Sequence, residues 1–161
     1  MAFLRKTSDA KLKGKAGIKG VPLILDEHYQ VHTLSLRYFL HCLDSVQPSS
    51  LGTYGAHICD FISQLEVDGK VVGEVDDNWL EHYKQAIIER DPEEDHNTEN
   101  YASQVCRSVI NYCVWLTERN YEPSLCGPTK NHRIQISYSE SHRIKHKTIK
   151  NWNKDKRHMQ A

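Results

Sequence analysis

The sequence lacks any long apolar stretch, and this absence bears first on membrane insertion. No run reaches the roughly 18 consecutive apolar residues that a transmembrane helix needs. The opening residues MAFLRKTSDAKLKGK also lack the apolar region that follows the charged start of a secretory signal. We therefore expect a soluble, cytoplasmic protein without a membrane partner.

The cysteines and glycines of the sequence do not form the motifs of a disulfide framework or a phosphate-binding loop. The five cysteines are an odd number without a C-x-x-C pair, and most stand at apolar, periodic positions, so we expect reduced packing residues. Gly14, Gly17 and Gly20 neither follow a predicted strand nor open a helix, as the glycines of a phosphate-binding loop do. The sequence therefore favours neither a disulfide framework nor a nucleotide-binding loop.

Histidine pairs are present, but without the partners of a metal site. His28 and His32 precede the first predicted helix, and His142 and His146 lie in the basic tail. Neither pair has cysteines or acids nearby at the spacing of a zinc site. No motif places a serine or cysteine nucleophile beside a base. We therefore assign no metal, no cofactor and no catalytic residue.

The formal net charge is zero, but the charges are unevenly distributed along the chain. Residues 1–20 carry six Lys or Arg and one acid, residues 21–130 carry seven against eighteen, and residues 131–161 carry eight against two. Ends rich in lysine and glycine bury too little apolar surface to order themselves. This distribution predicts a basic flexible arm at 1–20, a helical domain at 21–128 and a basic linker at 129–161, in which RIQISYS forms a short strand or an extended connection.

Four segments of the middle region repeat apolar residues at the three- and four-residue steps of a helix. The first covers residues 33–45 and ends before Pro48, which disfavours helical geometry in the residue before it. The second begins with a cap at Ser49 or Ser50 and stops near Gly69.

The third and fourth helices have similar signals at their ends. Asp76 or Asp77 caps the third, which runs through residue 89, and Asn97 or Thr98 caps the fourth. Asn120 suits the left-handed conformation that ends a helix. Four short amphipathic helices joined by short loops predict an all-α fold, a compact four-helix bundle.

The order of these segments resembles that of a known family. The stretches SSLGTYGAHICDFISQLEVDG, VDDNWLEHYKQAI and NTENYASQVCRSVINYCVWLTERNYEP resemble the N-terminal SAM-like, or core-binding, domain of tyrosine recombinases of the phage-integrase type. The resemblance covers residues 21–123. Its most specific parts are the Ser-Ser-x-x-x-Tyr opening of the second helix and the helix end at residues 112–120.

The resemblance implies a role in DNA integration and recombination by a mobile element. In the family, this domain and a larger catalytic domain clamp double-stranded DNA at a crossover site, together with other recombinase protomers. The catalytic domain carries the tyrosine nucleophile, and the chain ends before such a domain begins. We therefore expect a DNA-binding fragment that is not itself an enzyme.

Two helices and the tail present candidate DNA-binding side chains. The fourth helix has an almost uncharged polar face in which Arg107 is a lone cation, the second helix has a similar face, and the tail supplies lysines. Arg grips guanine, Asn and Gln grip adenine, and Lys neutralises phosphate. The candidates are Asn100, Ser103, Gln104, Arg107 and Asn111 on the fourth helix, Ser49, Ser50, Thr53, His57 and Gln64 on the second, and Lys145, Lys147 and Lys150 in the tail.

The sequence also allows a function other than DNA binding. Any soluble helix has a solvated polar face, and the excess of acids in residues 21–130 opposes DNA binding. Asp60 would repel phosphate if it shared the polar face of the second helix. The alternative is a helical protein–protein interaction module whose acidic surface binds a basic partner.

Overall fold

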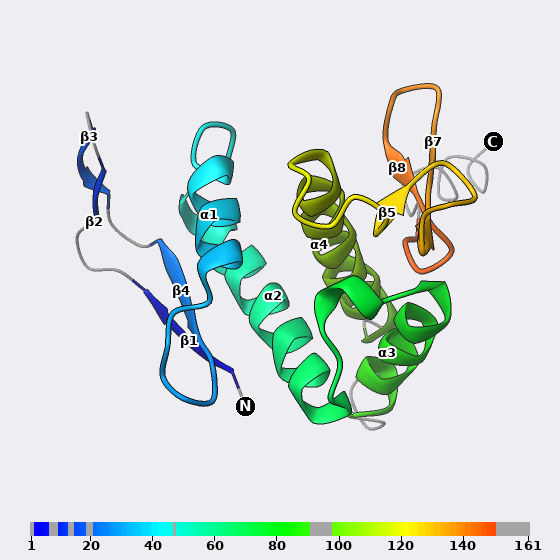
Figure 1. Cartoon of the computed structure of the whole chain (residues 1–161), viewed down its shortest axis with the longest axis horizontal. Coiled ribbons are helices and arrows are strands. Elements are labelled where there is room, and N and C mark those ends of the chain that lie inside the picture. Colours follow the sequence, from blue (N-terminus) through cyan, green and yellow to red (C-terminus); the bar gives the residue numbers. More distant parts are fainter. Residues whose placement is uncertain are drawn as a thin grey trace.

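Four α-helices form the body of the fold in the predicted order (Figure 1). The computed structural model describes residues 2–6, 10–12, 15–18, 21–46, 48–90 and 98–150. The helices are α1 (Thr33–Cys42), α2 (Pro48–Asp68), α3 (Asp77–Glu89) and α4 (Thr98–Glu118), with a short 3-10 helix, η1 (Val72–Glu74), between α2 and α3. The fold is compact and mostly helical, but small strands at both ends make it only approximately all-α. Two helices, α2 and α4, have 21 residues each, close to the bounds that the sequence predicted for them.

The predicted helix ends are confirmed in part, but Ser49, Ser50 and Thr98 are not caps, because α2 already begins at Pro48 and α4 begins at Thr98. Asp76 caps α3, because its side chain accepts a hydrogen bond from the backbone N–H of Trp79 at 2.8 Å. Gly69 and Asn120 follow α2 and α4 with φ angles of 63° and 62°, the left-handed conformation that stops a helix. The predicted cap Asn97 lies outside the described residues.

The core lies between the helices and is built from their apolar stripes. Leu51, Ile58 and Phe61 of α2 and Leu80 of α3 are fully buried, as is Leu116 of α4. Each such side chain contributes about 1.5–3 kcal/mol by leaving water. Aromatic rings extend this core in two groups, one around Tyr38, Tyr112 and Trp115 and one around Phe61, Trp79 and Tyr83.

The N-terminal residues pack on α2, which corrects part of the predicted flexible arm. Strand β1 (Phe3–Lys6) pairs antiparallel with β4 (Pro22–Leu25), and the backbone N–H of Ala2 donates to Ser63 Oγ at 3.2 Å. A Cβ on Gly55 would lie 2.6 Å from Pro22 Cβ, so this glycine lets β4 approach α2 closely. The first part of the basic arm gains order because β4, which lies outside the arm, supplies the pairing partner of β1. A second antiparallel pair joins β2 (Ala10–Leu12) and β3 (Lys15–Ile18).

The C-terminal segment returns to the helical core, whereas the sequence predicted that it leaves after Pro128. Strand β5 (Cys126–Gly127) runs parallel to β6 (Ile134–Gln135), and β7 (Ser137–Tyr138) pairs antiparallel with β8 (Ile144–Lys145), beside α4 in Figure 1. The sequence left RIQISYS open as a short strand or an extended connection, and the structure has two strands of two residues there, in different pairs. Ile134, Ile136 and Ile149 are buried in the same cluster as the helical side chains. These isolated isoleucines order a segment that is too charged to form a core of its own.

Candidate nucleic-acid interface

The polar face of α4 is partly exposed and partly covered. Gln104, Arg107 and Asn111 are exposed and Asn100 is half-buried. Ser103 is only 4% exposed, so it is not a surface for DNA, and its place among the predicted contacts was wrong. The three exposed side chains stand three and four residues apart and therefore share one side of the helix.

The backbone of the C-terminal segment covers Ser103. The N–H of Lys150 donates to Ser103 Oγ at 2.6 Å, and Arg107 Nη2 donates to the carbonyl oxygen of Lys150 at 3.2 Å. Ser103 and Arg107 of α4 therefore bind the backbone N–H and the backbone carbonyl of Lys150, respectively. The almost uncharged face of α4 is therefore, in part, a docking surface for the chain itself.

One member of the α2 polar stripe, His57, is buried against α4, contrary to the prediction. His57 is 4% exposed, its Nδ1 lies 2.7 Å from Ser108 Oγ, and its ring meets the edge of Tyr101. Burial lowers the pKa of His57, so the ring stays neutral near pH 7. This buried pair joins two helices and leaves His57 unavailable to DNA.

The other α2 candidates differ in how far solvent reaches them. Thr53 is exposed and Ser50 and Gln64 are half-buried, whereas the side chain of Ser49 lies outside the described residues. Gln64 Nε2 donates to Asp68 on the same helix at 3.1 Å. Among these residues, Thr53 is therefore best placed to meet a partner.

Asp60, which would repel phosphate if it stood free, is bound at the end of α3. Arg90 Nη1 donates to Asp60 Oδ1 at 2.7 Å, and the hydroxyl of Tyr83 donates to Oδ2. Burial, followed by the Asp60 carboxylate, raises the pKa of Tyr83, so this hydroxyl keeps its proton. Arg90 compensates the charge of Asp60 at this point of the surface.

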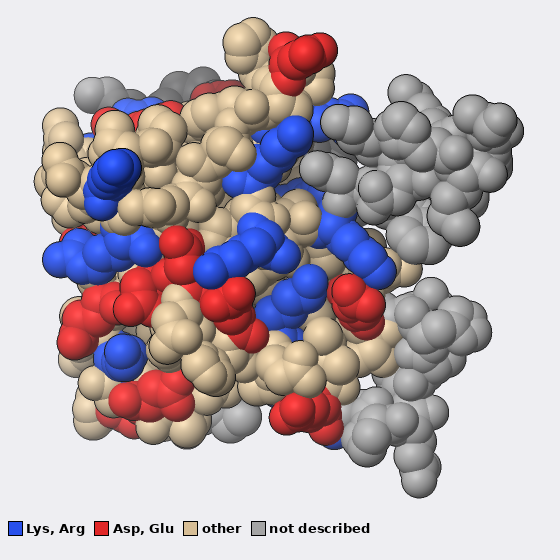
Figure 2. Space-filling view, turned by 90° about the vertical axis from the view of Figure 1, so that its right-hand side faces the viewer, with Lys and Arg blue, Asp and Glu red and all other residues tan. Residues whose placement is uncertain are grey.

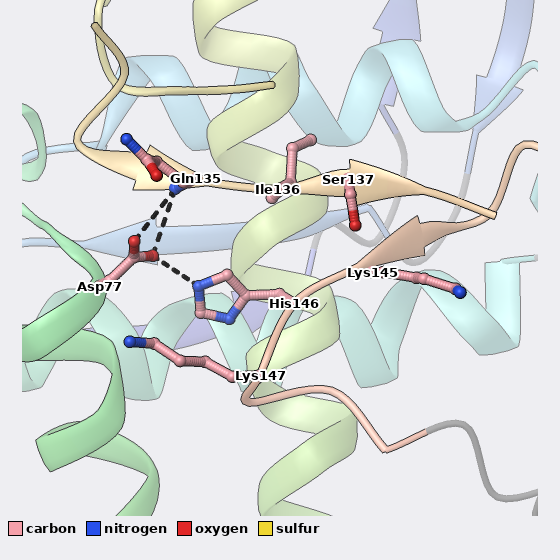
Figure 3. A pocket seen from close by; sticks show the side chains of 7 residues that line it. All are labelled: Asp77, Gln135, Ile136, Ser137, Lys145, His146 and Lys147. Carbon is pink, nitrogen blue, oxygen red and sulfur yellow. Dashed lines mark hydrogen bonds and ion pairs between the residues drawn. The ribbon is translucent and has the colours of Figure 1, made fainter. Parts of the chain in front are cut away.

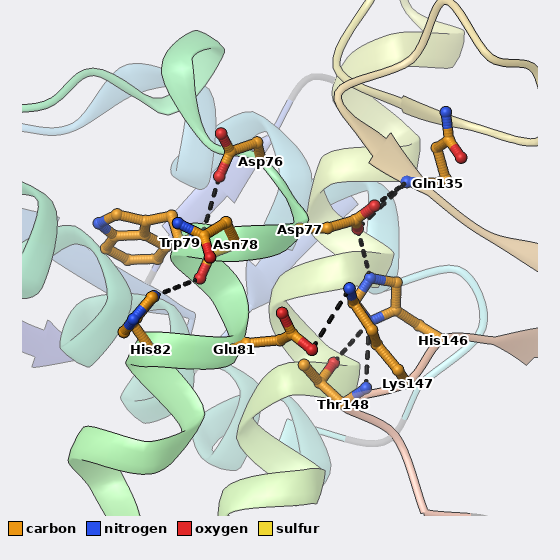
Figure 4. A network of polar contacts seen from close by, with 10 residues as sticks. All are labelled: Asp76, Asp77, Asn78, Trp79, Glu81, His82, Gln135, His146, Lys147 and Thr148. Carbon is orange, nitrogen blue, oxygen red and sulfur yellow. Dashed lines mark hydrogen bonds and ion pairs between the residues drawn. The ribbon is translucent and has the colours of Figure 1, made fainter.

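A polar network at the start of α3 holds the C-terminal segment (Figures 3 and 4). His146 Nε2 lies 2.6 Å from Asp77 Oδ1, and the N–H of Gln135 donates to the same carboxylate at 3.2 Å. The N–H of Thr148 donates to His146 Nδ1 at 3.2 Å, so Nδ1 is the acceptor and Nε2 carries the proton given to Asp77. The sequence did not predict this network, because its partners lie 69 residues apart.

A shallow hollow of about 530 Å³ adjoins this network (Figure 3). It is lined by Asp77, Gln135, Ile136, Ser137, Lys145, His146 and Lys147. Ser137 supplies the one hydroxyl among these lining residues, but both ring nitrogens of His146 already have other partners, Thr148 and Asp77. Among the described residues that line the hollow, no hydroxyl is therefore paired with a base that is free to accept its proton.

The three candidate lysines lie on a face where both signs of charge are mixed. Lys147 Nζ is 3.3 Å from Glu81 of α3, and Lys150 Nζ is 3.3 Å from Glu99 of α4, whereas Lys145 is half-buried and points away from Lys147 in Figure 3. Figure 2 shows Lys and Arg side chains across the middle of this face, with Asp and Glu among them. Folding thus brings two lysines of the basic tail against carboxylates of the acidic middle region.

A comparison with protein-family models, with curated proteins and with solved structures finds no match to the chain. The resemblance to core-binding domains therefore rests on the residue pattern alone. In the part of the chain that the structure describes, no helix is long and apolar enough to span a bilayer. Within the same residues, no three His, Cys, Asp or Glu side chains converge as metal ligands would.

Proposed function

We propose that this chain is the DNA-binding core domain of a site-specific tyrosine recombinase. The observation that carries the proposal is the contact between Arg107 and Lys150, because it places a tail lysine beside the exposed polar side chains of α4. Gln104, Arg107 and Asn111 then form a set of donors and acceptors suited to base edges. The helix order and helix ends that the sequence shares with the family add support.

In this proposal the lysines contact phosphates and α4 contacts bases. Lys147 and Lys150 are bound to Glu81 and Glu99 on the surface, where ion pairs contribute only about 0–1 kcal/mol each. A phosphate can therefore replace these carboxylates at small cost. Strand cleavage would belong to a separate catalytic domain, and this chain would position the duplex.

The protein-interaction module stays the second candidate, because of the carboxylates that accompany the lysines. Glu81 and Glu99 lower the positive potential that nonspecific DNA affinity requires. A module of this kind would bind a basic protein through its acids, and its affinity for duplex DNA would be negligible at physiological salt.

The experiment that separates these functions is selection of duplexes from a random pool, followed by anisotropy titrations of the selected and a scrambled sequence. Arg107→Ala should weaken binding to the selected duplex about tenfold or more and affect the scrambled duplex less, if Arg107 contacts a base. Arg119→Ala removes an exposed arginine just beyond the far end of α4 and should leave affinity unchanged.

Two further variants separate base contact from docking of the segment. Ser103→Ala removes the second contact to Lys150 without changing the exposed face, so it should leave DNA affinity almost unchanged. Replacing Lys145, Lys147 and Lys150 with alanine should lower the salt dependence by a slope of about 0.9 for each phosphate that these lysines no longer neutralise. Failure to select any duplex, with no salt-dependent binding, would contradict the recombinase proposal and favour the interaction module.

A further inference from the structure

Two arginines that are far apart in the sequence come together on the side of the fold where α1 and the end of α4 lie (Figure 1). Arg37 is exposed on α1, and Arg119 directly follows α4. Arg37 Nη1 donates to the Tyr121 hydroxyl at 2.8 Å, and Arg119 Nη2 donates to His41 Nδ1 at 3.4 Å. Because Arg37 and His41 are one helical turn apart, these four side chains form one arginine cluster.

The buried ring of Trp115 supports the arginine cluster. The ring centroids of Tyr121 and His41 lie 5.5 Å and 6.1 Å from that of Trp115, which is only 7% exposed. Tyr121 is 39% exposed, and Arg37 Cζ lies 6.0 Å from its ring centroid, a distance at which a guanidinium is attracted to the ring. The arginines therefore contact rings that pack on the core, which lowers the entropy that they lose on binding a partner.

Among the described residues, neither arginine of the cluster is paired with a carboxylate. The ion pairs that Arg and Lys form there belong to Arg90, Lys147 and Lys150. This is unexpected in an acidic region, since residues 21–130 carry seven Lys or Arg against eighteen acids. The negative end of the α4 dipole favours Arg119 at its position, but Arg37 lies in the middle of α1. Each guanidinium has five N–H donors, and the contacts above use one of them.

The composition of the arginine cluster favours a protein partner over nucleic acid. Arg, Tyr and Trp are the residues that most often carry the binding energy of protein interfaces. Duplex DNA is held by neutralising many phosphates, and two arginines in an acidic region neutralise too few. Carboxylates, in contrast, match the fork of a guanidinium with two parallel hydrogen bonds. An acidic segment with an apolar side chain is therefore complementary to this surface.

We propose that the arginine cluster binds an acidic segment of a partner protein. Carboxylates of the segment bind Arg37 and Arg119, and an apolar side chain packs against the exposed part of the Tyr121 ring. This surface does not include Gln104 or Arg107, and its interaction does not depend on the proposed DNA-binding function.

The test is selection of peptides from a random library by the immobilised full-length chain, followed by anisotropy titrations of one enriched peptide. Enriched sequences should contain more Asp and Glu than the unselected library, together with an apolar or aromatic residue. The same peptide with Asn and Gln in place of Asp and Glu should bind about tenfold more weakly, because the charge-assisted hydrogen bonds are lost. Affinity for the acidic peptide should also fall as the salt concentration rises.

Variants assign this preference to the two arginines. Arg37→Gln and Arg119→Gln should each weaken binding of the acidic peptide about three- to tenfold, and Arg37→Lys and Arg119→Lys should weaken it less, because lysine keeps the charge but not the fork. Lys130→Gln removes an exposed cation outside the cluster and should have no effect. Circular dichroism melts of the same variants separate a loss of affinity from a loss of folding.

The proposal would be overturned by selected peptides without an excess of acids, by equal affinity for the acidic peptide and its amide form, or by an equal loss in Lys130→Gln. Weaker duplex binding in Arg119→Gln without any peptide binding would assign the cluster to DNA instead. Arg107→Ala should weaken binding of the selected duplex and not of the peptide, so the failure of either proposal leaves the other intact.

Discussion

Asp77 and His146 are 69 residues apart in the sequence, yet Asp77 Oδ1 and His146 Nε2 lie 2.6 Å apart. The carboxylate belongs to the first turn of α3 and the imidazole follows β8, so this contact joins the C-terminal segment to the helical body. The His146 side chain is 1% exposed, which makes the contact costly to lose.

His146→Ala should therefore destabilise the fold and release the C-terminal segment. The change removes the donor to Asp77 and the acceptor for the Thr148 N–H, and buried polar groups left without partners cost about 1–3 kcal/mol. Urea denaturation gives the loss of stability, and amide exchange should rise in residues 144–149 more than in α4. Lys147→Ala is the matched control, because it removes only an exposed ion pair and should change stability by less than about 0.5 kcal/mol. Equal effects of both variants would contradict this role of His146.

The same substitution at two tyrosines should change stability in opposite directions. The Tyr112 hydroxyl is buried without a partner among the described residues, so Tyr112→Phe should raise the free energy of unfolding by about 1 kcal/mol. The Tyr83 hydroxyl donates to Asp60, so Tyr83→Phe should lower it by about 1–3 kcal/mol. Thermal and urea unfolding of both variants measure these changes. A loss of stability in Tyr112→Phe would show that its hydroxyl has a partner.

Stability should fall as the pH drops below about 6.5, the pKa of histidine in an unfolded chain. Burial lowers the pKa of His57 and His32 in the folded protein, so the unfolded state binds protons first as the pH falls. The stabilisation is complete above that pH and decreases below it, by at most about 1.4 kcal/mol per pH unit for each histidine. It stops decreasing once the pH falls below the lowered pKa of the folded state.

The slope of stability against pH in variants assigns this effect. His57→Gln should make the slope of stability shallower between about pH 6.5, the reference pKa of histidine, and about one unit below it, and His32→Gln should make it shallower by a further amount. Urea midpoints across this range give the slopes. If His57→Gln had the same slope as the unmodified protein, His57 would have the same pKa in the folded and unfolded states.

Helix ends were predictable from the sequence because their causes are local. Asp76 caps α3 through a residue three positions away, and Gly69 and Asn120 stop helices through their own backbone conformations. The orientation of the α2 polar stripe was not predictable in this way. A helical period shows that His57 shares a face with Thr53, but only the packed structure brings Ser108 to His57 as its buried partner.

In the candidate interface, too, the sequence predicted features that lie within one helix and missed contacts between distant segments. The sequence identified the exposed Gln104, Arg107 and Asn111 by their spacing, which is a property of one helix. It missed the docked segment, because the contacts of Lys150 with Ser103 and Arg107 span more than 40 residues. The one local signal was the presence of isolated isoleucines, such as Ile149, among the charges of the tail.

The position of Lys150 determines where the rest of the chain starts. Residues 119–150, if fully extended, would span about 100 Å and act as a long tether. Instead, Ser103 fixes residue 150 at the N-terminal half of α4, so these residues contribute almost no reach. Whatever is joined to the chain through residue 151 therefore starts beside α4, and the length of residues 119–150 does not dilute its effective concentration there.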